Sequence, residues 1–160
     1  MAKRKVTNAL VKYNRYLSDQ GTLFMGFPDY KVVGEPIITH RVRDCCGVVL
    51  FPYSTEIHLV GISHDTFDSC HPDSFHLQNL LHLMSSTLGS DSFFAVPFGG
   101  SRKNYEYNLG ILETNNIRVK GGYCDAYELR EGHFDKSVLA IPNTKEVILC
   151  QQGGARRLRG

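Results

Sequence analysis

Two apolar runs separated by a short turn constrain the fold of this chain more than any other feature. Residues 47–51 (GVVLF) are apolar at every position, residues 52–55 (PYST) form a turn signal, and residues 56–63 make a second strand-like run. A run, a turn and a second run predict two neighbouring strands. Because the first run is apolar at successive positions, we expect both of its faces to be buried.

Cysteine and histidine residues lie at the ends of these two predicted strands. Cys45 and Cys46 precede the first run, and His64 ends the second. Neighbouring strands can therefore bring a thiol and an imidazole together. The thiolate is the nucleophilic form of cysteine, and an adjacent imidazole makes it available at neutral pH. The pattern predicts a candidate Cys–His pair.

Two choices within this pair stay open at the level of the sequence. Adjacent strand residues point to opposite faces, so only one of Cys45 and Cys46 can meet His64, and Cys46 is the alternative nucleophile. His58 lies an even number of residues before His64, so on a regular strand it shares a face with His64 and is the alternative base. The structural alternatives are a core thiol at Cys45 and a surface imidazole at His58.

The cysteines and histidines also form a candidate zinc set, because both residue types bind that metal. Their spacing lacks the paired C-x₂-C and H-x₃-H patterns that mark a strong zinc site. We therefore expect no metal and no organic cofactor. The candidate set comprises Cys45, Cys46, His58, His64, Cys70 and His71.

Composition points to a soluble protein of one domain. The chain has 160 residues, of which 42% are apolar and 21% charged, as is ordinary for a globular domain. Its formal net charge of +2 is too small to indicate nucleic acid as the main partner. No stretch predicts a secretory signal or a membrane span, and five cysteines give no disulfide framework. We expect a cytoplasmic protein with reduced thiols, or an effector exported without a classical signal.

Helical spacing occurs in two segments, residues 6–17 and residues 73–88. Residues 101–116 are polar and rich in asparagine, and they leave room for only a short helix near residues 109–114. The candidate caps are Thr7 or Asn8 for the first helix and Asp73 or Ser74 for the second, whose apolar stripe is Leu77, Leu80, Leu81, Met84 and Leu88 and whose end is Gly89.

Strand patterns outnumber helical ones, so we predict an α+β domain with mixed or antiparallel sheet layers and helices on one side. Residues 1–20 form an N-terminal helical arm, residues 21–150 the domain, and residues 151–160 a disordered basic tail. The other predicted strands lie within residues 22–33, 36–39, 93–98, 117–120, 123–129, 137–141 and 146–150, the last two forming a hairpin.

Several of these segments, in order, resemble the CheD family of chemoreceptor glutamine deamidases. The resemblance spans residues 24–149, and its strength comes from the order and spacing of short motifs. The matching segments are residues 25–32 (MGFPDYKV), 39–45 (THRVRDC), 61–64 (GISH), 98–100 (FGG), 108–110 (NLG) and 137–149.

This resemblance implies a hydrolase that converts a glutamine carboxamide to a carboxylate and ammonia without a cofactor. Cys45 would be the nucleophile, His64 the general base and acid, and Thr39 the group that fixes the imidazole tautomer. Backbone N–H groups near Asp44 would stabilise the oxyanion, and a turn at residues 99–100 (Gly99 and Gly100) would let backbone approach the substrate. The implied partner is a protein with an exposed glutamine, as in chemotaxis, together with a regulatory protein, and neither nucleic acid nor membrane.

Two departures from the family pattern support other interpretations. Arg43 and Asp44 replace the family's Gly-Ser before the cysteine, and an acidic Asp44 opposes ionisation of the thiol. A CheD-like binding or regulatory module without activity is therefore the alternative function. The Asp44-Cys45 and 60–64 segments also look like the laccase-domain family, in which cysteine and histidine bind metal, although this chain has no suitably placed upstream histidine.

Overall fold

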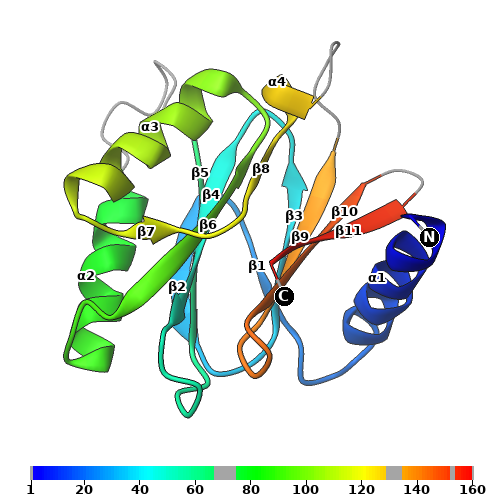
Figure 1. Ribbon diagram of the computed structural model, residues 1–160, viewed down its shortest axis with the longest axis horizontal. Coiled ribbons are helices and arrows are strands. Elements are labelled where there is room, and N and C mark those ends of the chain that lie inside the picture. Colours follow the sequence, from blue (N-terminus) through cyan, green and yellow to red (C-terminus); the bar gives the residue numbers. More distant parts are fainter. Residues whose placement is uncertain (1, 67–74, 129–134, 152–153, 160) are drawn as a thin grey trace.

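The structure, a computed structural model, describes residues 2–66, 75–128, 135–151 and 154–159, with side chains from Asn8 onward. Two β-sheets pack face to face, and helices cover both outer faces (Figure 1). The helices are α1 (Ala2–Leu17), α2 (His76–Leu88), α3 (Arg102–Thr114) and the single turn α4 (Asp125–Glu128). The α+β class and the sheet layers are confirmed, whereas the expectation of helices on one side is wrong.

Each sheet combines strands from distant parts of the chain. The first sheet has the order β1-β3-β9-β10-β11 and is antiparallel except for the β1–β3 pair. The second has the order β2-β5-β4-β6-β7, with β8 also paired to β6. The strands are β1 (Leu23–Met25), β2 (Asp29–Val33), β3 (Ile37–Val42), β4 (Cys46–Pro52), β5 (Val60–Asp65), β6 (Phe93–Gly99), β7 (Arg118–Val119), β8 (Tyr123–Cys124), β9 (Lys136–Ile141), β10 (Glu146–Gln151) and β11 (Gly154–Arg159).

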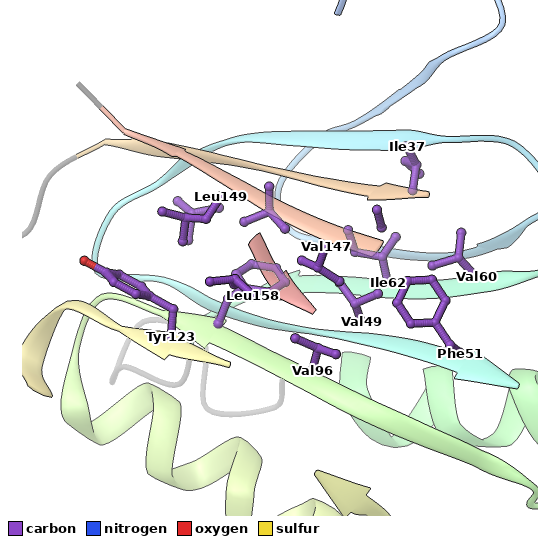
Figure 2. Close-up of a cluster of buried hydrophobic side chains, with 14 of the residues drawn as sticks. Ile37, Val49, Phe51, Val60, Ile62, Val96, Tyr123, Val147, Leu149 and Leu158 are labelled. Atoms are coloured by element: carbon purple, nitrogen blue, oxygen red, sulfur yellow. The ribbon is translucent and has the colours of Figure 1, made fainter. Parts of the chain in front are cut away.

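Alternate residues of the central strands fill the layer between the sheets. On β4, Val49 and Phe51 face this layer, while on β5 it is Val60 and Ile62 (Figure 2). The intervening residues of β4, such as Val48, pack beneath the helices instead. The prediction that both faces of this strand are buried is confirmed, because a helix layer covers the face that the other sheet does not.

The helices on the outer faces pack through the stripes that their sequences predict. On α2, four stripe residues are buried, Leu88 is partly buried against the same cluster, and Gly89 ends the helix in a left-handed conformation. The predicted caps Asp73 and Ser74 lie outside the described residues. On the other side, Ala9 and Tyr13 of α1 pack against the first sheet.

Three element predictions are corrected by the structure. The N-terminal helix begins at Ala2, so neither Thr7 nor Asn8 caps it. The polar segment forms a full helix, α3, whose N-cap Ser101 accepts a hydrogen bond from the Asn104 backbone N–H. Its polar side chains face solvent or, at Asn104 and Asn108, bond to Asp44 and Cys46, so low hydrophobicity did not exclude a helix. Residues 125–128 turn into α4 instead of extending a strand.

The C-terminal segment is the fourth correction. The hairpin of β9 and β10 is confirmed, but residues 154–159 continue it as β11, antiparallel to β10. Ala155 and Leu158 of β11 are buried, and Arg157 binds Glu146 at 2.8 Å. An Arg-rich composition therefore hid a strand in which Ala155 and Leu158, three positions apart, are the buried residues. No helix among the described residues has the length and apolar character to cross a membrane.

Candidate active site

Thr39 and His64 meet in the layer between the two sheets. Thr39 lies two residues after Ile37 on β3, and His64 lies two residues after Ile62 on β5. Because the side chains of a strand alternate between its two faces, Thr39 and His64 point into the same core layer as Ile37 and Ile62. Thr39 Oγ1 lies 2.6 Å from His64 Nδ1, and both residues are fully buried. The hydrogen bond that the sequence predicted between them is present.

The partners of Thr39 determine which imidazole nitrogen carries the proton. The Thr39 hydroxyl donates its single proton to the Met25 carbonyl oxygen at 3.2 Å, so it accepts from His64 Nδ1–H. Nε2 then carries the free lone pair of the neutral ring. This Nε2 is buried and has no hydrogen-bond partner among the described residues, which leaves it available as a base.

The environment of His64 keeps the ring neutral. Burial, followed by the positive charge of Lys136, lowers the pKa of His64 from 6.5 to about 4. The ring of Phe27 covers the imidazole, with centroids 5.0 Å apart and planes tilted by 58°. At neutral pH the residue is therefore an unprotonated base.

The two adjacent cysteines have different surroundings. Cys46 is the first residue of β4, pairs with Asp65, and is fully buried. Its sulfur lies 3.1 Å from Asn108 Nδ2 of α3, so it faces the helix layer. Cys45 immediately precedes β4 and is partly exposed. It lies two residues before Gly47, on the same face of the strand, and Gly47 pairs directly with His64. Alternation along the strand thus associates Cys45, and not Cys46, with the imidazole face.

The Cys45 thiol is protonated at rest. Burial raises its pKa, backbone N–H groups of Arg43 and Cys45 itself counteract this by hydrogen bonding to the sulfur, and the charges of Asp44 and Asp65 raise it further. No hydrogen bond joins its sulfur to His64 among the described residues. The resting pair is therefore a neutral thiol beside a neutral imidazole, and a proton transfer between them requires closer approach.

The alternative base is in the wrong place. His58 precedes β5, which begins only at Val60, and it is exposed. It precedes the first residue of β5, whereas Asp65, the partner of Cys46, is the last residue of that strand. The prediction that His58 shares a regular strand with His64 is wrong, because the segment before Val60 is irregular.

Gly99 and Gly100 support the nucleophile loop, residues 42–45, by close packing. A Cβ on Gly100 would lie 1.5 Å from the Arg43 carbonyl oxygen, and one on Gly99 would lie 3.1 Å from the Cys46 Cβ. The Gly100 N–H donates to the Cys45 carbonyl at 3.0 Å. The backbone that these glycines allow to approach closely is that of the loop itself.

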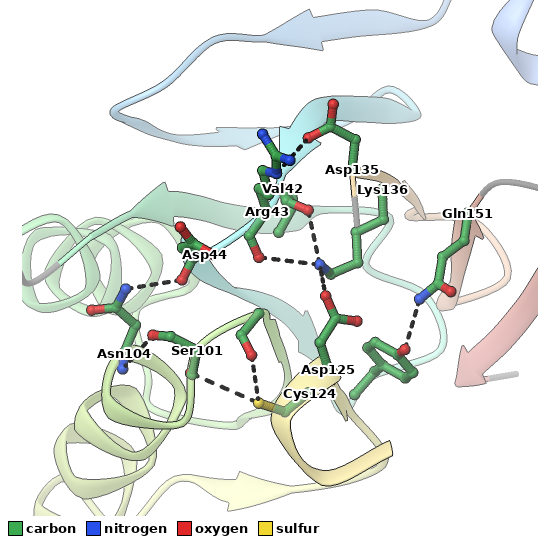
Figure 3. A network of polar contacts seen from close by, with 12 residues as sticks. Val42, Arg43, Asp44, Ser101, Asn104, Cys124, Asp125, Asp135, Lys136 and Gln151 are labelled. Atoms are coloured by element: carbon green, nitrogen blue, oxygen red, sulfur yellow. Dashed lines mark hydrogen bonds and ion pairs between the residues drawn. The ribbon is translucent and has the colours of Figure 1, made fainter. Parts of the chain in front are cut away.

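Several groups around the loop were not anticipated from the sequence. Lys136 and Asp125 form a fully buried ion pair at 2.6 Å beside the loop (Figure 3). Asn104 Nδ2 of α3 donates to the Asp44 carbonyl at 2.9 Å. At the start of α2, which covers the second sheet, His76 Nδ1 lies 2.6 Å from Asp65 Oδ2. The sequence carries no local signal for this cluster, because its members come from separate segments of the chain.

Among the residues that the structure describes, no three histidine, cysteine or acidic side chains are grouped as metal ligands. Cys70 and His71 of the candidate zinc set lie outside those residues. Comparison of the chain with models of known protein families gives no match, and comparison with curated protein sequences gives none either.

Proposed function

We propose that this protein is a cysteine-dependent protein-glutamine deamidase. The observation that carries the proposal is the buried Thr39–His64 hydrogen bond, which orients an imidazole with Nε2 free at the end of β5. Cys45 precedes the neighbouring strand on the same face. A nucleophile, a base and a third group that orients the base are the parts that covalent hydrolysis of an amide requires.

The first half of the reaction forms a thioester. The Cys45 sulfur attacks the side-chain carbonyl carbon of glutamine while His64 Nε2 takes the thiol proton. The carbonyl oxygen becomes an oxyanion, and backbone N–H groups of the nucleophile loop donate to it, at a value of ~3 kcal/mol for each well-placed donor. The C–N bond then breaks, and His64 gives its proton to the departing ammonia.

The second half restores the enzyme. His64 Nε2 removes a proton from a water molecule, and the resulting hydroxide attacks the thioester carbon. The carbon–sulfur bond breaks, the sulfur regains the proton from His64, and the glutamine has become glutamate. The neutral state of His64 suits both halves, because each begins with proton removal.

A protein substrate fits the surroundings of Cys45 better than a free amino acid. The thiol is only partly exposed, and the exposed aromatic rings of Phe24 and Phe27 contact His40 and His64, respectively. An extended side chain from a protein surface can reach such a thiol while its backbone contacts the aromatic residues. We infer a cytoplasmic or effector setting, in which the four described cysteines stay reduced, as they are in the structure.

The test is a trapped thioester. The protein is incubated with p-nitrophenyl acetate, and the acetyl group is located by peptide mass spectrometry. Ammonia release from an N-blocked glutaminyl peptide is measured in parallel. Acetylation at Cys45, slow deacetylation in His64→Ala, and ammonia release lost in Cys45→Ala support the proposal. Cys46→Ala is the matched control and should keep both activities. Acetylation at every cysteine alike, without ammonia release, overturns it.

A second candidate, a CheD-like binding module without activity, is favoured by one observation. Burial and the nearby charges of Asp44 and Asp65 raise the pKa of the Cys45 thiol, and the thiol makes no hydrogen bond to the imidazole in the described structure. The same experiment separates the candidates, because a binding module shows no difference between Cys45→Ala and Cys46→Ala.

A further inference from the structure

Lys136 is a charged side chain enclosed within the protein core. It stands on the core-facing side of β9, in phase with Val138 and Ala140, and its side chain has no exposed area. Its Nζ lies 2.6 Å from Asp125 Oδ2, 2.9 Å from the Val42 carbonyl and 3.3 Å from the Arg43 carbonyl. An ammonium has three protons, and each has an acceptor here, so the group stays charged despite burial.

Two of these acceptors belong to a longer series. Every backbone carbonyl of the nucleophile loop, residues 42–45, accepts a hydrogen bond from elsewhere in the protein, and Figure 3 shows such bonds to Val42, Arg43 and Asp44. The donors are Lys136 Nζ for Val42 and Arg43, the Ser101 N–H and Asn104 Nδ2 for Asp44, and the Gly100 N–H for Cys45.

This arrangement has a chemical consequence for the loop. Its carbonyl oxygens are held by outside donors, and the C=O and N–H groups of a trans peptide point in opposite directions. The N–H groups of the loop therefore point away from those donors, and the backbone of Arg43 and of Cys45 lowers the pKa of the Cys45 thiol. A carbonyl oxygen turned toward the sulfur would repel both the thiolate and the oxyanion that follows it. Lys136 holds the two carbonyls nearest the start of the loop.

We propose that Lys136, held by Asp125, is a positioning residue that keeps the carbonyls of the nucleophile loop away from Cys45 and its N–H groups toward it. The catalytic role of this positioning rests on the proposed deamidase function, but the effect of Lys136 on the reactivity of the Cys45 thiol does not. The charge acts on His64 as well. Three charged residues lie around His64: its strand partner Asp29 on β2, the adjacent Asp65 on β5, and Lys136 on β9 of the other sheet, whose charge lowers the imidazole pKa.

The design of the variant follows from the ion pair. Lys136→Met alone leaves the carboxylate of Asp125 buried and uncompensated, which is destabilising enough to unfold a small protein. The double variant Lys136→Met/Asp125→Asn removes both charges with little change of volume, and such replacements are often neutral for stability. It therefore tests positioning in a folded protein, which circular dichroism and thermal melting verify.

The readouts do not depend on catalysis. Cys45 is labelled with iodoacetamide at a series of pH values from about 5 to about 10, a range that includes the ordinary pKa of a free thiol, about 8.5. NMR follows the His64 ring over the same series. In the double variant we expect the midpoint of Cys45 labelling to rise and the His64 pKa to move from about 4 toward 6.5. Glu146→Gln, which removes a carboxylate on the α1 side of the first sheet, is the control and should leave both unchanged.

The two proposals fail in different ways. If the folded double variant shows the labelling midpoint and the His64 titration of the wild type, the positioning role of Lys136 is wrong. If those two quantities shift but wild-type Cys45 forms no acetyl thioester, Lys136 positions the loop and the deamidase function is wrong. When both hold, acetylation of Cys45 in the double variant should slow by about 100-fold, as for loss of one oxyanion donor.

Discussion

Thr39 and His64 belong to different sheets, yet a 2.6 Å hydrogen bond joins Thr39 Oγ1 to His64 Nδ1 in the layer between the sheets. Neither β3 nor β5 alone orients the imidazole. The base therefore forms only when the two sheets have packed, and its orientation depends on the same core that stabilises the fold.

Replacing Thr39 by valine should impair acylation of Cys45 without unfolding the protein. Valine has nearly the same shape but cannot accept the Nδ1–H, so the ring is free to rotate and to change tautomer. Loss of a group that orients a functional histidine typically costs ~10–100-fold. The rate of acetylation by p-nitrophenyl acetate measures this loss.

Thr39→Ser provides the control for that variant. Serine keeps the hydroxyl and should restore most of the rate, whereas a purely structural role for the methyl group would make serine the worse replacement. Equal rates in the wild type and Thr39→Val would show that the hydrogen bond has no part in the chemistry.

Phe27→Ala should raise the pKa of His64. The Phe27 ring covers the imidazole, and burial is the largest cause of the lowered pKa of about 4. Water that replaces the ring solvates the charged imidazolium, so the pKa should move toward 6.5. An NMR titration of the ring protons measures it. Phe24→Ala is the matched control, since Phe24 stacks on His40, and it should leave the His64 titration unchanged.

Local patterns were sufficient to predict much of this fold. The apolar runs of β4 and β6, the stripe of α2 and the turn between β9 and β10 each carry their signal within one segment. The helix α3 and the strand β11 do not, because their formation depends on partners elsewhere. In β11 only Ala155 and Leu158 are buried, and two buried residues among arginines give no period that identifies a strand.

The candidate site was predictable where it follows strand order. The ends of two predicted strands indicate a Cys–His pair, and the resemblance to the CheD family implies Cys45 and Thr39. The structure brings Thr39 and His64 into contact. Lys136 pairs with Asp125, 11 residues away, and hydrogen bonds to the nucleophile loop, 94 residues away at Val42. A single sequence contains no local signal for such a contact, since its only cause is the packing of β9 against β3.

The stability of the protein should fall between about pH 7 and pH 4 because of His64. In the unfolded chain the ring has its ordinary pKa of 6.5, and in the folded protein the pKa is about 4. As the pH drops below 6.5, the unfolded state binds a proton that the folded state excludes, so the free energy of unfolding decreases until about pH 4. The shift corresponds to roughly 3 kcal/mol.

Urea unfolding across this pH range measures the effect, with His64→Gln as the comparison. The variant has no titrating group at this position, so its loss of stability over the same range should be smaller by a similar amount. Parallel pH dependences in the two proteins would mean that the folded imidazole titrates normally.

Gly100→Ala and Gly110→Ala should have opposite effects. A Cβ at Gly100 would lie 1.5 Å from the Arg43 carbonyl oxygen, so the loop or the turn must move. We expect a loss of about 2–4 kcal/mol together with slower acylation of Cys45. Gly110 lies within α3 with open space around its Cβ position, and alanine there should stabilise by ~0.5–1 kcal/mol. Thermal melts of both variants decide whether close packing against the loop is the reason that position 100 requires glycine.

Leu158→Ala tests whether the C-terminal segment is a strand in solution. Leu158 is buried among the side chains between the sheets, and truncating it should cost about 2–3 kcal/mol by lost burial and a cavity. In a disordered tail the same change would cost nothing. Arg156→Ala is the control, because Arg156 is exposed on the same strand. Its guanidinium lies 5.0 Å from the centre of the Tyr123 ring and 4.0 Å from Glu128 Oε2. Its removal should cost less than ~1 kcal/mol. Equal melting temperatures for Leu158→Ala and the wild type would contradict the packing of β11. They would also contradict its pairing with the edge of β10.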